Sequence, residues 1–299
     1  MEGIPVAAVL GVVASVAFFV VGFSVQDWGG PVGDPTGGKR DGTWGTWSTD
    51  YALGVQCLVY GMTAPGGTGA TSARVGFLVE GLGWAGAGIM HQFFYQPSST
   101  HDVLWMTSLV LGVFAGPLKA GGVAVMAAAK DDSSSKRRAA TIGRYATFGL
   151  CAAFLVGLAE SGVIPLPGWT VALFTKSSAM LSIVISGCGA TAPAEAAMVA
   201  ATFALAIGIN VIKPQPFLWS PDFNDNGLFH SAGMLYLAAT LVLLGRLTRA
   251  GQVGNKDELE ELMRRKAEIE TAISEFDAPE TDEVGLLCCS ACTGPSPRR

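Results

Sequence analysis

Residues 103–129 read VLWMTSLVLGVFAGPLKAGGVAVMAAA, a long apolar run in which Lys119 is the only charged side chain. A helix crosses a bilayer core of about 30 Å with about 20 apolar residues. Only helices and closed barrels satisfy every backbone polar group in lipid, and this run is too long and continuous for a barrel strand. The run therefore predicts a transmembrane helix.

Seven further runs of the same kind occur along the chain. Half of the residues are hydrophobic, only 14% are charged, and 39 are glycine, which suits closely packed helices in lipid. We therefore expect an all-α protein, a polytopic membrane helical bundle with a seven-helix core plus one N-terminal helix, surrounded by membrane lipids. The seven runs are residues 4–24, 47–64, 74–95, 140–160, 163–187, 192–212 and 228–247.

These runs divide the chain into five segments. Residues 1–25 are either a retained transmembrane helix or a signal anchor, because the start Met1-Glu2-Gly3 lacks the positive charge of a signal peptide. The remaining segments are an extracytoplasmic linker (26–46), the seven-helix transmembrane domain (47–248), a cytoplasmic amphipathic or coiled-coil helix (249–276) and a disordered, cysteine-containing tail (277–299).

Basic residues indicate the topology. An excess of Lys and Arg in short flanking segments marks the cytoplasmic side of a membrane protein. Four spans separate the two basic segments, so both lie on one side, and we expect a cytoplasmic C-terminus. The net charge of −5 and the lack of a basic stripe indicate no nucleic-acid partner. The two segments contain Lys130, Lys136, Arg137, Arg138 and Arg144, and Arg246, Arg249, Lys256, Arg264, Arg265 and Lys266.

Four titratable residues fall at the opposite, outer level of the predicted spans: Asp50, His91, Asp102 and His230. Ionisable side chains within membrane spans are costly and usually face the bundle interior or a wet cavity. We therefore expect His91, Asp102 and His230 to converge in one cavity. Asp50 either belongs to this site or only opens a helix, where a carboxylate favours the helix dipole.

Four motifs carry a resemblance to a known family. They are Ser48-Thr49-Asp50-Tyr51, Gly88-Ile89-Met90-His91, His101-Asp102 and Asn226-Gly227-Leu228-Phe229-His230. With them, residues 47–248 resemble the seven-transmembrane superfamily of alkaline ceramidases and adiponectin receptors (the CREST type).

The resemblance implies a zinc site and hydrolysis of a lipid amide. It implies His91 and His230 as metal ligands, with Asp102, Asp225 or His101 as the third ligand. If Asp102 is not a ligand, it would hold a water. Asp102 and Asp50 would then be the catalytic carboxylates. Three protein ligands and a water are typical of catalytic zinc.

Two departures from the family pattern favour a different function. Asn226 stands where the family has a further histidine, and Ala87 stands where it has a serine. His91 and His230 could therefore be interior polar residues that tie two helices together. The protein would then be a non-catalytic structural or receptor-like subunit of a larger membrane complex.

Glu80 and Lys119 lie at matching depth in two consecutive antiparallel runs. An unpaired charge in lipid is expensive, so we expect these two side chains to form an ion pair.

Residues 255–276 carry an apolar stripe among many charges. Its alternating spacing of three and four residues is typical of a coiled coil, but a helix lying on the membrane or on the cytoplasmic loops fits as well. Either way the segment is expected to be helical, and it could bind a protein partner. The stripe consists of Leu259, Leu262, Ile269, Ile273 and Phe276.

Overall fold

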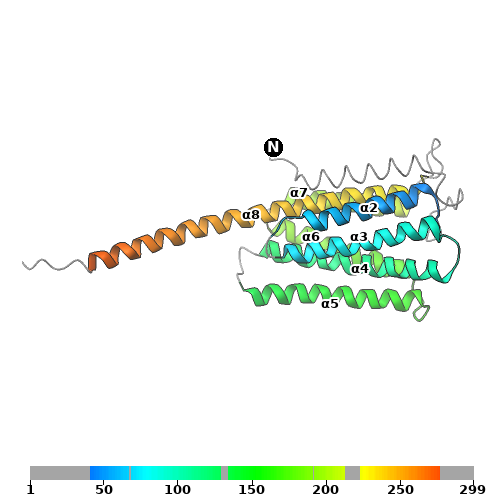
Figure 1. The fold of residues 1–299 in the computed structure, drawn as a ribbon, viewed down its shortest axis with the longest axis horizontal. Helices are drawn as coiled ribbons and strands as arrows, with labels where there is room; N and C mark the ends of the chain where they lie inside the picture. The colour runs from blue at the N-terminus through cyan, green and yellow to red at the C-terminus, as the bar shows by residue number, and fades with distance from the viewer. Residues whose placement is uncertain (1–40, 67–68, 129–133, 191, 213–222, 277–299) are drawn as a thin grey trace, which may run out of the picture. The chain divides into compact units, whose positions relative to one another are not determined.

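The computed structural model describes residues 41–66, 69–128, 134–190, 192–212 and 223–276, and these residues are helical with short connections. The predicted helix at residues 4–24 lies outside them. The chain divides into two units, Met1–Gln252, here called the bundle, and Val253–Arg299. The helices are α2 (Trp44–Thr63), α3 (Ala70–Phe93), α4 (Ser99–Ala127), α5 (Ser135–Glu160), α6 (Gly168–Gly189), α7 (Pro193–Ile212) and α8 (Asp225–Phe276), labelled in Figure 1.

The protein is a multi-pass integral membrane protein. Five segments are long and apolar enough to cross a membrane: Ser99–Ala127, Ser135–Glu160, Gly168–Gly189, Pro193–Asn210 and Asp225–Ala250. Helices α2 and α3 are not among these five, although they have 20 and 24 residues. They carry polar side chains that the bundle buries, Asp50 and Glu80 among them. The count of seven membrane spans thus stays a prediction for α2 and α3.

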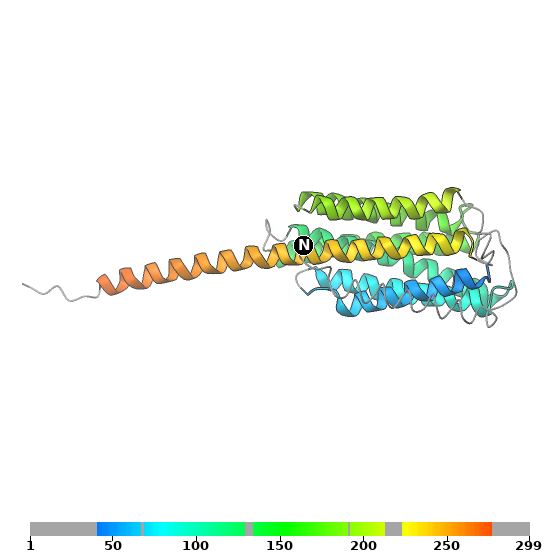
Figure 2. The same ribbon diagram turned by 90° about the horizontal axis from the view of Figure 1, so that it is seen from above.

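Within the bundle the helices run side by side with nearly parallel axes (Figures 1 and 2). Helix α3 packs between α2 and α4, and α4 also contacts α5 and α6. One core cluster joins Leu53, Phe77, Ile183, Val199 and Leu241, which come from five different helices.

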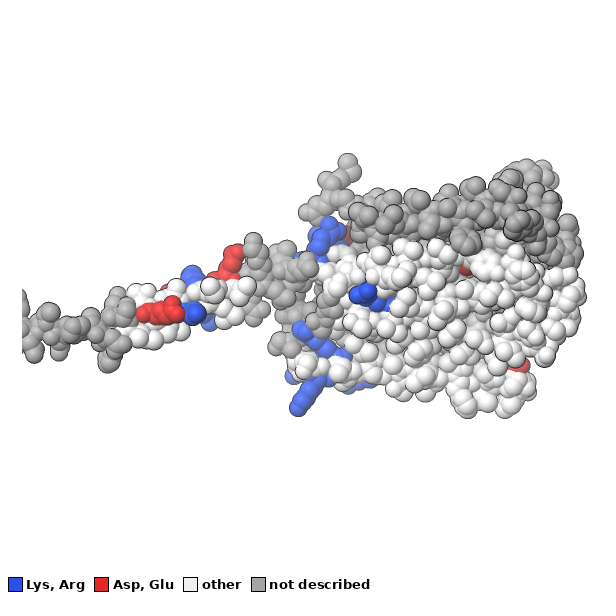
Figure 3. All heavy atoms as spheres, viewed as in Figure 1, with Lys and Arg blue, Asp and Glu red and all other residues white. Residues whose placement is uncertain are grey.

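The face of the bundle seen in Figure 3 is mostly apolar where its residues are described. Figure 3 shows few charged side chains along the helices, and Lys and Arg gather at the end where α4 ends and α5 begins. Large exposed apolar side chains on α5 and α6 include Phe148, Phe154, Phe174 and Ile185. An apolar outside with basic groups at one end is the distribution expected of a bundle surrounded by lipid.

Three predicted boundaries differ from the structure. Helix α2 begins at Trp44, inside the predicted linker, so Asp50 lies beyond its first turn and does not open it. Helix α6 begins at Gly168 rather than at residue 163, because Pro165 and Pro167 hold the preceding residues in turns. The predicted tail helix is confirmed as helical, but it is the continuation of α8 and not a separate helix.

Glycines let neighbouring helix backbones approach closely. A Cβ atom on Gly122 of α4 would lie 2.7 Å from the Gly69 carbonyl oxygen and 2.7 Å from the Ala73 nitrogen. These are backbone atoms, so no side chain can move aside. Small residues at such contacts are how membrane helices pack tightly.

We therefore expect Gly122→Ala to lower the free energy of unfolding by about 1–3 kcal/mol, because α3 and α4 must separate. Thermal unfolding of the purified protein measures this change. Gly143→Ala is the control, since a Cβ atom there meets nothing within 4 Å. Alanine favours a helix over glycine, so the control should be neutral or slightly stabilising. Equal melting temperatures for the two variants would contradict the close packing.

Candidate functional site

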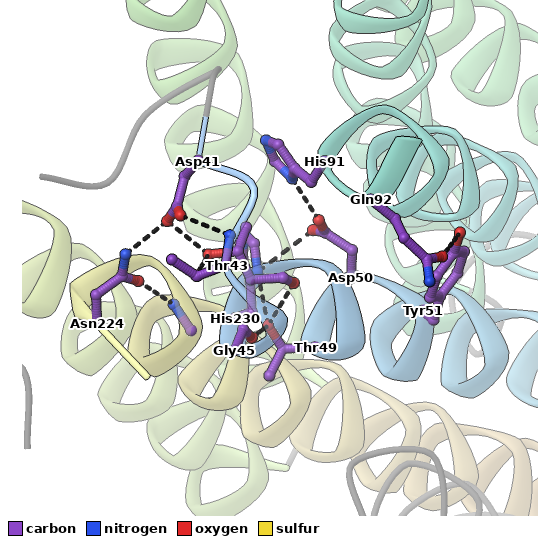
Figure 4. Close-up of polar contacts among 12 residues, drawn as sticks. Asp41, Thr43, Gly45, Thr49, Asp50, Tyr51, His91, Gln92, Asn224 and His230 are labelled. Atoms are coloured by element: carbon purple, nitrogen blue, oxygen red, sulfur yellow. Dashed lines mark hydrogen bonds and ion pairs between the residues drawn. The ribbon is translucent and has the colours of Figure 1, made fainter. Parts of the chain in front are cut away.

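Two histidines share one buried carboxylate at the end of the bundle where α2 and α8 begin (Figure 4). The Nδ1 atom of His91 lies 2.6 Å from Oδ2 of Asp50, and the Nδ1 atom of His230 lies 3.3 Å from Oδ1 of the same residue. Asp50 is fully buried, and each histidine is 3% exposed. One side chain of α2 thus connects the end of α3 to the start of α8.

The contacts assign the same tautomer to both imidazoles. A carboxylate only accepts hydrogen bonds, so Nδ1 of His91 carries the proton that Asp50 accepts. Thr49 has one hydroxyl proton, which it donates to the Gly45 or Thr46 carbonyl at 2.7 and 2.9 Å. Its oxygen then accepts from Nδ1 of His230 at 3.0 Å. The Nε2 atom of each ring is therefore the acceptor when the ring is neutral.

A second carboxylate, Asp41, fixes the starts of α2 and α8. It accepts hydrogen bonds from the Thr43 backbone N–H at 3.1 Å and from the Thr46 hydroxyl at 2.6 Å. It also accepts from the Asn224 amide at 2.6 Å, and the Asn224 oxygen in turn accepts from two backbone N–H groups in the first turn of α8. Asn224 is thus the N-cap of the helix that carries His230.

One buried atom of the histidine pair has no partner. The Nε2 atom of His91 makes no hydrogen bond within the described part of the chain, although the residue is almost fully buried. Three neighbouring atoms are also buried without a hydrogen-bond partner: Oδ1 of Asp50, the indole nitrogen of Trp47 and the hydroxyl of Ser48. Buried polar atoms in native proteins nearly always have a partner, and exceptions often mark functional positions. The His91 ring is held at one nitrogen, and its other nitrogen is buried without a hydrogen-bond partner.

Asp102 has different neighbours from the histidine pair. Its Oδ1 atom lies 2.9 Å from Nδ1 of His101, and its side chain is 64% exposed. It lines a shallow hollow between the start of α4 and the end of α5, together with Glu160 and Ser161. The structure therefore brings together His91, His230 and Asp50, and it places Asp102 in another hydrogen-bonded pair.

The described side chains do not form the zinc site that the resemblance implies. Among residues 41–66, 69–128, 134–190, 192–212 and 223–276, no three His, Cys, Asp or Glu side chains are arranged to hold a metal ion. Asn226, which stands where the family has a further histidine, donates its backbone N–H to the Asn224 side-chain oxygen. Asp50 orients the His91 imidazole through Nδ1, and Thr49 orients the His230 imidazole in the same way. Such orientation suits ligand histidines, but a third ligand is missing from this arrangement.

A second buried ionic cluster lies deeper in the bundle. The Lys119 ammonium donates to Glu80, which confirms the predicted ion pair, and the Lys176 ammonium lies 3.7 Å from the other oxygen of Glu80. Lys176 also sits over the Trp84 ring at 5.0 Å. The same ring meets His230 edge-on, with 5.0 Å between the ring centroids. Trp84 thus separates the ionic cluster from the histidine pair.

Sequence reasoning missed Thr49, Asp41 and Asn224 as parts of this site. Asp41 fell in the predicted linker, and Thr49 was taken only as part of a motif. A signal was present for Asn224, because Asn followed by an acidic residue is a common helix start.

Comparison with known proteins gives a family but no function. The model of a family of unknown function, DUF6962, matches residues 45–249, which include α2 to α7 and the membrane part of α8. No curated protein and no solved structure matches the chain.

Proposed function

The chain belongs to the DUF6962 family, whose function is unknown, and we propose from its own residues that it is a membrane-embedded hydrolase with His91 as general base. The observation that carries this proposal is the free Nε2 atom of His91 in a ring whose Nδ1–H is held by Asp50. A carboxylate in this position fixes the tautomer and stabilises the imidazolium that forms when the base takes a proton.

The proposed substrate is a lipid amide in the outer half of the membrane. This class comes from the resemblance to alkaline ceramidases. Nε2 of His91 would remove a proton from a water molecule, and the resulting hydroxide would attack the amide carbonyl carbon. The imidazolium would then return the proton to the leaving amine. His230 would stay beside this carboxylate, with its Nδ1–H donated to Thr49 and its Nδ1 atom 3.3 Å from Oδ1 of Asp50.

The proposed orientation puts this site at the outer face. The basic residues of α5 and of the end of the α8 span lie at the other end of the helices, and such residues stay in the cytoplasm. The C-terminus is then cytoplasmic.

A second function has its own support. The histidine pair is buried, and its hydrogen bonds join α2, α3 and α8. These are the properties of a clamp that holds helices together in a non-catalytic structural or receptor-like subunit.

The test is release of a labelled acyl chain from an N-acyl lipid in vesicles that contain the purified protein. We expect His91→Gln and Asp50→Asn to lower the rate at least 100-fold, the usual contribution of a general base. Asp102→Asn should keep the rate within about threefold, because that residue has another partner. Melting temperatures of all variants check that they remain folded.

Two outcomes would contradict the proposal. If Asp102→Asn and zinc chelation abolish the activity, the metal site implied by the resemblance is the correct mechanism. If wild-type protein releases no acyl chain while Asp50→Asn lowers the melting temperature, the clamp is the correct function.

A further inference from the structure

The last part of α8 carries an uncovered apolar stripe. We call residues 253–276 the tail segment. Leu259, Leu262, Ile269 and Ile273 are 55–60% exposed in the structure, and charged residues surround them. Contiguous exposed apolar side chains on a charged helix mark an interaction surface.

We propose that the tail segment pairs with the tail segment of a second copy of this chain, as a parallel two-stranded coiled coil. The stripe follows the heptad spacing, with residues 259, 266 and 273 at position a and residues 262, 269 and 276 at position d. Two copies inserted into one membrane with the same topology present their tail segments on the same side and in the same direction. This shared direction favours a parallel pair.

Charges beside the stripe fit this pairing. Arg265 falls at position g and Glu270 at position e of the next heptad, and these positions meet across a parallel pair. Their side chains are 67% and 66% exposed, so both are accessible to a partner. The twofold symmetry makes this attractive contact twice. In an antiparallel pair, position g would face position g and position e would face position e, which places like charges together.

Lys266 restricts the number of chains. It occupies an a position in the stripe, and its ammonium lies 3.6 Å from Glu270 of the same helix. A charged residue at a single a position costs stability but selects register and oligomeric state. In a two-stranded coil the ammonium can reach water at the edge of the seam, whereas higher oligomers enclose it.

The acidic residues of the tail segment argue against a membrane surface as its partner. Helices that lie on membranes carry mostly Lys and Arg on the polar face, because they bind anionic lipids. The described part of this segment mixes both signs. Hydrogen bonds from Arg264 and Arg265 hold the pKa of the Glu261 carboxyl below its ordinary value, so that residue is ionised at neutral pH.

The experiment measures dimerisation of the full-length protein, labelled with a fluorophore and reconstituted at known dilution in vesicles. We expect Arg265→Glu or Glu270→Arg alone to weaken association about tenfold, because two attractive contacts become repulsive. The double variant, which exchanges the two charges, should recover to within about threefold of wild type. Arg264→Glu is the matched control: Arg264 pairs with the same Glu261 as Arg265 does, but it lies outside the seam.

Three results would overturn the proposal. They are a monomeric wild type at every protein-to-lipid ratio, a double variant no better than the single ones, and an Arg264→Glu variant as weak as Arg265→Glu. Leu262→Asp with Ile269→Asp should abolish dimerisation. If this pair of changes instead leaves dimers intact, the stripe is not the contact.

Discussion

Glu80→Gln is expected to lower the free energy of unfolding by about 3–5 kcal/mol, the usual cost of breaking a buried ion pair by removing one partner. Glu80 is the carboxylate for two ammonium groups, those of Lys119 and Lys176. Lys119 is 1% exposed and lies between the rings of Phe77 and Tyr236. Without Glu80, the bundle would hold two cations with no carboxylate beside them.

The lysine variants should follow a definite order. Lys119→Met is expected to cost less than Glu80→Gln, because Glu80 keeps Lys176 as its cation. Lys176→Met should be neutral or stabilising, since it removes the cation in excess of the Glu80–Lys119 pair. Chemical unfolding of each variant gives the order, and Glu268→Gln, on the exposed tail segment, is the control for loss of a carboxylate. A loss below about 1 kcal/mol for Glu80→Gln would show that the pair contributes little.

The Glu80–Lys119 pair could be predicted because both residues sit in long apolar runs. Counting residues from the membrane faces at 1.5 Å each gives similar depths, and lipid penalises any other arrangement. Lys176 was equally visible in the sequence, but its partner was not. The polar and apolar side chains of α6 do not separate onto two faces, so its pattern does not fix how it is rotated about its own axis.

The depth of the site in the membrane could be predicted, but the set of residues that form it could not. Charge-based topology put Asp50, His91, Asp102 and His230 at one end of the bundle, and three of them do interact. Asp102 does not join them, because its carboxylate pairs with the imidazole of His101, the preceding residue in the sequence. Depth gives a residue's position along the membrane normal. Which residues become its neighbours at that depth depends on how the helices pack.

Asp41 is the clearest example of a site residue that the sequence alone could not indicate. It precedes the first described helix, and nothing periodic surrounds it in the sequence. Its partner Asn224 lies 183 residues away along the chain. Contacts between connecting segments depend on how the whole bundle closes, so local patterns could not indicate this one.

Asp41→Ala is therefore a sharp test of the structure, with an expected loss of about 3–5 kcal/mol in the free energy of unfolding. Asp41 is fully buried and accepts from three donors: the Thr43 backbone, the Thr46 hydroxyl and the Asn224 amide. Each buried donor left without an acceptor costs about 1–3 kcal/mol, and the three costs are not fully additive because the donors are neighbours.

Two further variants separate the loss of stability in Asp41→Ala from a general effect of removing a charge at the outer end of the bundle. Thr46→Val removes one of the three donors and should cost about 1 kcal/mol. Asp102→Ala removes an exposed carboxylate in the first turn of α4, where its interaction with the helix dipole is about 0.3–1 kcal/mol. Asp41 holds the amide of Asn224, whose oxygen caps α8, so Asp41→Ala should also speed hydrogen exchange in the first turn of α8. Melting temperatures for Asp41→Ala and Asp102→Ala that fall together would contradict this role for Asp41.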